Sequence, residues 1–294
     1  MALPQAQQPA VFEEYVGASS LEEALRALAD GKATPVAGGT DLWVQKDLGI
    51  RPVARRLINI RRVPEIAGIS EYGTSIRLGA LVTMTEILES ELLLAASPVL
   101  PATADRFASI QIRNVSTVGG NIVNASPAAD MVIPLLCLDA EIELASWTGN
   151  KIATRRLKLA EFFTGPGKSK RKPEELLTSV DFDAPGKDFR AGFCKTGPRP
   201  ALEIAVVSMG FATYLKDGVL SDVRIALGAV APTPVRCPKT EIMLEGKKPD
   251  DATIAGALEI LDSEISPIAD HRSSVWYRRR LARVYLEQEL TACR

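Results

Sequence analysis

The feature that most constrains this sequence is a pair of double-glycine motifs. The first lies in the string PVAGGTDL at residues 35–42, and the second lies in STVGGNIV at residues 116–123. Glycine can adopt a positive φ and lets the backbone approach a ligand closely, and consecutive free amide N–H groups form a concave anion site. One Gly-Gly pair alone more often marks an ordinary turn. The two motifs together predict two loops that hold a diphosphate between them.

The composition indicates a soluble globular protein. The 294 residues suffice for about two domains with cores of their own, and 46% apolar with 24% charged residues is typical of such domains. A net charge of −1 argues against nucleic acid as a partner. No apolar run approaches the ~20 residues of a membrane span, and the first ten residues lack the pattern of a secretion signal. We therefore expect a cytoplasmic protein.

Cysteine and histidine usage limits the possible chemistry. The cysteines Cys137, Cys194, Cys237 and Cys293 are far apart, and none forms a C-x-x-C pair. Zinc and iron–sulfur sites usually need clustered ligands, so we expect no metal site in this chain. His271 is the only histidine, which excludes H-E-x-x-H sites and most histidine-dependent nucleophiles. If the chain is part of an enzyme, a bound cofactor carries the chemistry.

The sequence pattern predicts a small β-α-β unit at the start of the chain. Residues 20–31 form an amphipathic helix, in which Ser20 is the N-cap and Glu23 completes a capping box. Strands are expected after this helix, at 34–37 and 56–60. Beyond residue 60 we expect strands at 75–80, 141–147 and 151–157, and helices at 83–90, 98–108 and 128–138.

Residues 165–173 combine Gly, Pro, Ser and Lys and are interpreted as a domain boundary. We expect a first domain at residues 1–172, with subdomains at about 1–60 and 61–172, and a second at 173–294. The second domain is predicted as an antiparallel sheet covered by helices. Its strands are expected at 175–182, 189–195, 204–215 and 222–230, and its helices at 250–265 and 273–291. The fold class is α+β.

Two common nucleotide sites are absent from the sequence. No G-x-G-x-x-G follows a predicted strand, so a Rossmann dinucleotide site is unexpected. No G-x-x-x-x-G-K-[ST] is present, which argues against P-loop chemistry. What remains is a diphosphate held between two separate loops of an α+β domain.

The two motifs and their flanks resemble those of a known family. AGGTDL at residues 37–42, TVGGN at 117–121 and SPAAD at 126–130 are similar to the FAD-binding motifs of the medium subunit of molybdenum hydroxylases. This family includes xanthine dehydrogenase, carbon monoxide dehydrogenase and 4-hydroxybenzoyl-CoA reductase. The resemblance runs nearly end to end, and it includes QIRN at 111–114 and YRR at 277–279.

The resemblance implies a two-part FAD-binding domain of the vanillyl-alcohol-oxidase/PCMH type, followed by a small flavoprotein C-terminal domain. Both glycine motifs would wrap the pyrophosphate through backbone N–H groups. Without the resemblance, the sequence favours a structural interpretation of three of these positions: a first-turn carboxylate stabilised by the helix dipole for Asp130, a core residue for Phe107 and a solvated strand-end lysine for Lys195. The positions that match the family's FAD-binding residues are Pro35, Val36, Ala37, Gly38, Gly39, Thr40, Asp41, Leu42, Phe107, Ala108, Thr117, Val118, Gly119, Gly120, Asn121, Asp130, Leu177 and Lys195.

The resemblance also implies a role in electron transfer. A small iron–sulfur subunit with 2Fe–2S clusters would pass electrons to noncovalent FAD in this chain, which would pass them to an external acceptor. A large molybdopterin-binding subunit would carry the molybdenum cofactor and the organic substrate, and dimers of heterotrimers would be usual. No residue of this chain would act as an acid or base on that substrate. A stand-alone flavin oxidoreductase and a noncatalytic nucleotide-binding scaffold remain as alternatives.

Overall fold

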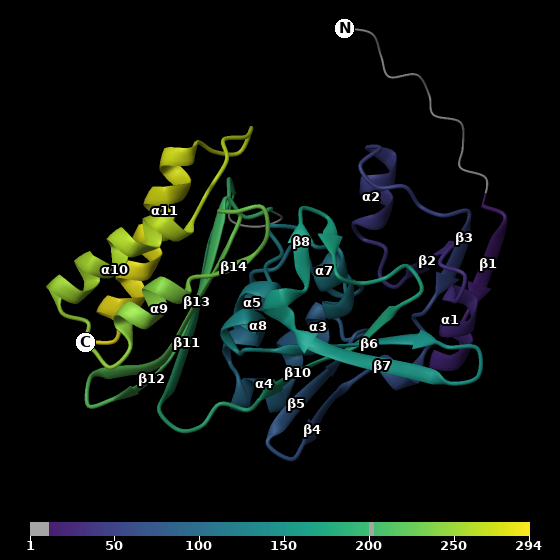
Figure 1. Cartoon of the computed structure of the whole chain (residues 1–294), viewed down its shortest axis with the longest axis horizontal. Helices are drawn as coiled ribbons and strands as arrows, with labels where there is room; N and C mark the ends of the chain where they lie inside the picture. Colours follow the sequence, from purple (N-terminus) through teal and green to yellow (C-terminus); the bar gives the residue numbers. More distant parts are fainter. Residues whose placement is uncertain (1–11, 200–202) are drawn as a thin grey trace, which may run out of the picture.

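The computed structural model describes residues 12–199 and 203–294. Three groups of elements follow one another along the long axis of the molecule (Figure 1). A small parallel sheet lies at one end, a five-stranded sheet with short helices lies in the middle, and a four-stranded sheet with longer helices lies at the other end. Among the described residues, no helix is both long and apolar enough to cross a bilayer.

The first group is a small parallel sheet with helix α1 (Leu21–Leu28) packed on it. Strand β3 (Arg56–Asn59) pairs in parallel with β1 (Glu14–Gly17) on one side and with β2 (Ala33–Val36) on the other. The predicted β-α-β unit is confirmed, with Ser20 accepting a hydrogen bond from the amide of Glu23. Strand β1 and the short helix α2 (Leu42–Asp47) had no clear signal in the sequence.

The middle group is built on an antiparallel sheet of order β4-β5-β10-β6-β7. The predicted hairpin of β6 (Glu141–Trp147) and β7 (Ile152–Lys158) is confirmed. The other strands are β4 (Ile69–Tyr72), β5 (Ser75–Gly79) and β10 (Leu176–Asp183).

The structure corrects the assignment of residues 175–182 to the C-terminal sheet. Strand β10 pairs with β5 and β6, so it is the central strand of the middle sheet. The Gly- and Lys-rich residues 165–173 are not a linker, because they include part of the two-stranded hairpin of β8 (Phe163–Gly165) and β9 (Lys168–Ser169). We therefore infer that the boundary between the two domains follows Asp183 rather than residue 172.

Short helices connect the strands of the middle group. The predicted helices at 83–90 and 98–108 correspond to α3 (Met84–Glu89) and α5 (Val99–Asp105). The predicted helix at 128–138 is shorter, because α8 (Val132–Cys137) begins only two residues before Pro134, where a missing amide N–H costs least. The remaining helices are α4 (Glu91–Ala96), α6 (Ile110–Arg113) and α7 (Val118–Val123), with 3-10 turns at Pro64–Ile66 and Leu159–Glu161.

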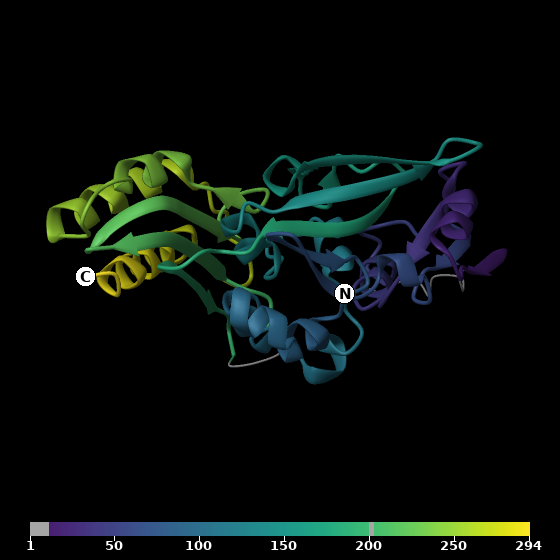
Figure 2. The ribbon, with the colours of Figure 1, turned by 90° about the horizontal axis from the view of Figure 1, so that it is seen from below.

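The C-terminal group is the expected antiparallel sheet with helices. Its strands run in the order β11 (Phe189–Thr196), β12 (Val207–Lys216), β13 (Val219–Gly228) and β14 (Val235–Arg236). Helices α9 (Pro238–Leu244), α10 (Asp251–Glu264) and α11 (Val275–Thr291) pack with this sheet in a core of its own. Figure 2 shows these helices gathered at the C-terminal end of the molecule, away from the middle sheet.

Helix α8 joins the two domains. It packs against β12 and β13, and a Cβ built on Gly210 of β12 would lie 2.9 Å from the Sγ of Cys137. Ala212 and Ala226 of the C-terminal sheet belong to the same apolar core as α8. The C-terminal domain is therefore anchored on the helix that follows the second glycine motif and Asp130.

Candidate functional site

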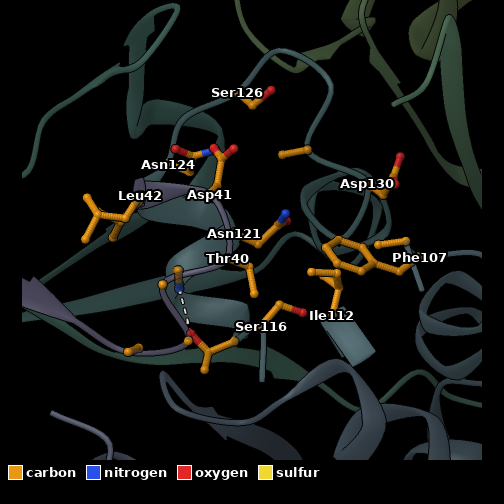
Figure 3. A pocket seen from close by; sticks show the side chains of 18 of the residues that line it. Thr40, Asp41, Leu42, Phe107, Ile112, Ser116, Asn121, Asn124, Ser126 and Asp130 are labelled. Carbon is orange, nitrogen blue, oxygen red and sulfur yellow. Dashed lines mark hydrogen bonds between the residues drawn. The ribbon is translucent and has the colours of Figure 1, made fainter. Parts of the chain in front are cut away.

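A cavity of about 410 Å³ lies where the three groups of elements approach one another. This volume is within the range of small-molecule sites. Its walls include the β2–α2 connection and helices α6 and α7 (Figure 3). Residues 203–204 of the C-terminal domain also line it. Of the predicted site residues, it is lined by Pro35, Val36, Ala37, Gly38, Gly39, Thr40, Asp41, Leu42, Phe107, Ala108, Thr117, Gly120, Asn121 and Asp130.

The first glycine motif forms a sharp turn between β2 and α2. Gly39 has a φ of 69°, in the left-handed region that other residues rarely adopt. Gly38 faces the lead-in to the second motif so closely that a Cβ there would lie 1.9 Å from the carbonyl oxygen of Val115. Each glycine is therefore required by a different constraint, one conformational and one steric.

The turn leaves a row of backbone amides free. Within residues 12–199 and 203–294, none of the amide N–H groups of residues 38–42 donates a hydrogen bond to the protein. All of these residues line the cavity. Successive free N–H groups in a tight turn form an anion-binding nest, so the first motif has the character that its sequence predicts.

The second glycine motif differs from its prediction, because it is not a loop. Thr117 is the N-cap of helix α7, and its hydroxyl accepts a hydrogen bond from the amide of Gly120 at 3.1 Å. The amides of Val118 and Gly119 donate to the carbonyls of Val82 and Ala80, and that of Asn121 donates to the carbonyl of Thr117. The expectation of a row of free N–H groups is wrong for residues 118–121, whose amides the fold uses, whereas the amide of Thr117 donates no hydrogen bond within the described residues.

The two glycines of the second motif allow two close approaches. A Cβ on Gly119 would lie 2.7 Å from both the Cβ and the carbonyl oxygen of Ala80, so Gly119 lets α7 pack on the end of β5. Gly120 lines the cavity, and the nearest atom to a Cβ there is the Oγ1 of Thr117 at 3.0 Å. Gly120 therefore leaves space on the cavity side.

Three buried oxygens in the cavity wall have no partner. They are the Oγ of Ser116, the Oδ1 of Asn121 and the Oδ1 of Asp130, and none has a hydrogen bond with the described residues. A buried polar atom without a partner costs about 1–3 kcal/mol. Because all three line the same cavity, they indicate that its ligand carries polar groups.

Asp130 and Lys195 form a buried ion pair beside the cavity. The Oδ2 of Asp130 lies 2.7 Å from the Nζ of Lys195, which also donates to the carbonyls of Arg106 and Glu203. The Asp130 side chain is 8% exposed and that of Lys195 is 1% exposed. Burial raises the pKa of Asp130, although Lys195 opposes this shift.

Four predicted site residues do not line the cavity. Val118 and Gly119 lie behind it, in the packing between α7 and the middle sheet. Leu177 is a core residue of β10, opposite Leu144 of β6. Lys195 reaches the site through its ion pair with Asp130 and its hydrogen bond to the carbonyl of Glu203.

The sequence argument missed several residues of the wall. Ser116 is the first residue of the second motif, and Asn124 directly follows the motif. Asn124 lies four positions after Gly120, on the same helical face. A helical interpretation of the motif would have found it. Arg51 is the one cationic side chain among the lining residues in the described part of the chain. The other missed residues are Ile112, Val123, Ser126, Ala128, Ala129, Glu203 and Ile204.

Known proteins share both parts of this architecture. Residues 10–183 match the family described as "FAD binding domain in molybdopterin dehydrogenase". Residues 193–292 match the family described as "CO dehydrogenase flavoprotein C-terminal domain". The chain belongs to this flavoprotein family. As a member it is an FAD-binding subunit of an oxidoreductase, and the predicted two-part FAD domain with a flavoprotein C-terminal domain is confirmed.

The relatives agree over nearly the whole chain. The glyceraldehyde dehydrogenase medium chain of Sulfolobus acidocaldarius is 32% identical over 92% of this chain and 94% of its own length. The xanthine dehydrogenase FAD-binding subunit of Escherichia coli O157:H7 is 32% identical over 92% of each chain. A solved CO dehydrogenase from Oligotropha carboxidovorans has a TM-score of 0.89 at 26% identity, covering 96% of this flavoprotein and 97% of the solved chain.

Proposed function

We propose that this chain is the FAD-binding electron-transfer subunit of a multi-subunit, molybdenum-dependent dehydrogenase. It would take electrons from 2Fe–2S clusters of a small partner subunit and pass them to an external acceptor, while a large molybdopterin-binding subunit acts on the organic substrate. The observation that carries this proposal is the convergence of free amides and unpartnered oxygens on one cavity. The names of the relatives, which include medium chains and FAD-binding subunits, support the division into subunits.

The residues of the cavity fit FAD. The amides of residues 38–42 would bind the diphosphate, because they provide positive partial charge without a cationic side chain. The free oxygens of Asn121 and Asp130 would accept hydrogen bonds from hydroxyl or N–H groups of the cofactor, and the Ser116 hydroxyl could donate or accept. The half-buried Phe107 would shield the site from water. Bound FAD would supply a carrier that can exchange electrons with both one-electron and two-electron partners.

The attachment of FAD should be noncovalent. The only histidine, His271, lies in the turn before α11 and does not line the cavity. A histidyl bond to the cofactor near the first motif is therefore excluded. We also propose that the complex works in the cytoplasm and that it assembles as a dimer of heterotrimers.

Flavin content tests this proposal directly. The purified chain should be yellow, should bleach with dithionite, and should release all of its FAD into the supernatant when it is denatured. A chain that stays colourless and does not bind added FAD would favour the alternative of a noncatalytic nucleotide-binding scaffold. Substrate turnover by the isolated chain would instead favour the stand-alone flavin enzyme.

A further inference from the structure

The amide nest has an acidic residue within it. Asp41 lies at the N-cap position of α2, where a side-chain oxygen normally accepts a hydrogen bond from the second or third amide of the helix. Ser20 of α1, Thr83 of α3 and Asp250 of α10 do this in the same protein. Asp41 makes no such bond, and its carboxylate lies among the residues that line the cavity.

The Asp41 carboxylate instead takes part in a cluster of three side chains, which we call the Asp41–Asn124–Gln45 clasp. The Oδ2 of Asp41 accepts hydrogen bonds from the Nδ2 of Asn124 at 2.5 Å and from the Nε2 of Gln45. The same Nε2 of Gln45 donates to the Oδ1 of Asn124 at 2.7 Å. Figure 3 shows Asp41 and Asn124 facing each other at the rim of the cavity. The clasp joins α2, which follows the first motif, to the C-terminal end of α7, which contains the second.

The position of this charge matters for an anionic ligand. If Asn124 did not hold it, the Asp41 carboxylate would be free to rotate beside the amides of residues 38–42, one of which is its own. Its charge would then repel a diphosphate bound there, because like charges a few ångströms apart interact strongly outside bulk water. The clasp prevents this while it satisfies the carboxylate.

We propose that Asn124 is a positioning residue for the flavin nucleotide, which keeps the Asp41 carboxylate away from the amide nest of residues 38–42. This inference rests on the proposed function, since it takes the ligand of the nest to be a diphosphate. Asn124 does not need to touch the cofactor for this role. Its effect depends on the negative charge of Asp41.

A double-mutant series separates this role from simple packing. Apoprotein of the full chain is titrated with FAD for the parent, Asn124→Leu, Asp41→Asn and the double variant. We expect Asn124→Leu to raise the FAD dissociation constant about tenfold or more, the scale of a lost hydrogen bond to a charged group. Asp41→Asn keeps an amide oxygen that can accept from Asn124 and serves as the uncharged reference for the double variant. In the double variant, where no carboxylate is released, the dissociation constant should return toward that of the parent.

The dependence of FAD affinity on ionic strength is a second measurement, and a change in packing alone would not alter it. Because repulsion between carboxylate and phosphate is screened, the difference between Asn124→Leu and the double variant should shrink as ionic strength rises. Asn114→Leu is a matched control, since it removes an exposed hydrogen bond to Thr85 outside the cavity. It should leave FAD affinity unchanged.

Two results would overturn the inference while leaving the proposed function intact. One is an Asn124→Leu chain that binds FAD as tightly as the parent. The other is equal weakening in Asn124→Leu and in the double variant, which would make Asn124 a packing residue only. A parent chain that binds no FAD would overturn the proposed function and this inference with it.

Discussion

Within the described residues, the amides of residues 38–42 in the first glycine motif donate no hydrogen bond, whereas those at residues 118–121 of the second are all hydrogen-bonded within the fold. The first motif is a sharp turn in which Gly39 has a positive φ. The second is the first turn of helix α7, capped by Thr117. The difference suggests that one motif binds the ligand through its amides and that the other shapes the opposite wall through side chains and a bare glycine surface.

The largest effect should come from the contact between the two motifs. Gly38→Ala would place a methyl group 1.9 Å from the Val115 carbonyl oxygen, which is backbone and cannot rotate away. We expect FAD retention to be lost and the free energy of unfolding to fall by about 1–3 kcal/mol, as for other overpacked sites. Flavin absorbance and chemical denaturation measure the two effects. Gly17→Ala is the control, because nothing lies within 4 Å of a Cβ at Gly17.

Gly120→Val should separate binding from folding. The new side chain would enter the cavity and press on the Oγ1 of Thr117, so FAD content should fall sharply. The C-terminal domain, whose core is separate, should stay folded. FAD content per chain and far-UV circular dichroism test this, with Gly17→Val as the control. Undiminished flavin content would remove the second motif from the site.

Asp130→Asn should have a smaller effect on binding. The variant keeps an acceptor oxygen but removes its charge, and a hydrogen bond to a charged group is worth up to about 1.5–3 kcal/mol. Burial raises the pKa of Asp130, so the ionised acceptor is lost as the pH falls through that raised pKa. The advantage of the parent over Asp130→Asn should therefore shrink toward acidic pH. FAD dissociation constants that are equal at neutral pH would refute a binding role for Asp130.

The smallest effect is expected for the cap of the second motif. Thr117→Ala removes the acceptor for the Gly120 amide, and loss of an N-cap costs about 1 kcal/mol of stability. Thr117→Ala should lower the free energy of unfolding about as much as Ser20→Ala, which is the matched change at the cap of α1, away from the cavity. FAD affinity should change less than in Asp130→Asn. A larger loss of affinity would mean that Thr117 contacts the ligand.

The sequence predicted the location of the cavity because both glycine motifs do line it, but it could not distinguish their conformations. Glycine is a poor helix former, so residues 118–123 had the composition of a loop. Their helix depends on tertiary contacts, above all the packing of Gly119 against Ala80, which no local pattern reveals. Likewise, the assignment of β10 depends on its partners β5 and β6, which lie far away in the chain.

Contacts at the site between side chains that lie far apart in the sequence could not be predicted either. The pair of Asp130 and Lys195 joins residues from two domains, and Asn124 meets Asp41 only in the folded chain. The resemblance to the family marked Asp130 and Lys195 individually, but the ion pair between them is a property of the fold. Leu177 matched by position and proved to be a core residue of β10.

Hydrogen–deuterium exchange of the backbone amides, measured without and with FAD, tests the contrast between the two motifs most directly. The amides of residues 38–42 should exchange rapidly in the apoprotein and become strongly protected when FAD binds. Those of residues 118–121 should be protected in both states, because their hydrogen bonds are internal. Protection that FAD induces mainly in the second motif, or in neither, would contradict this account.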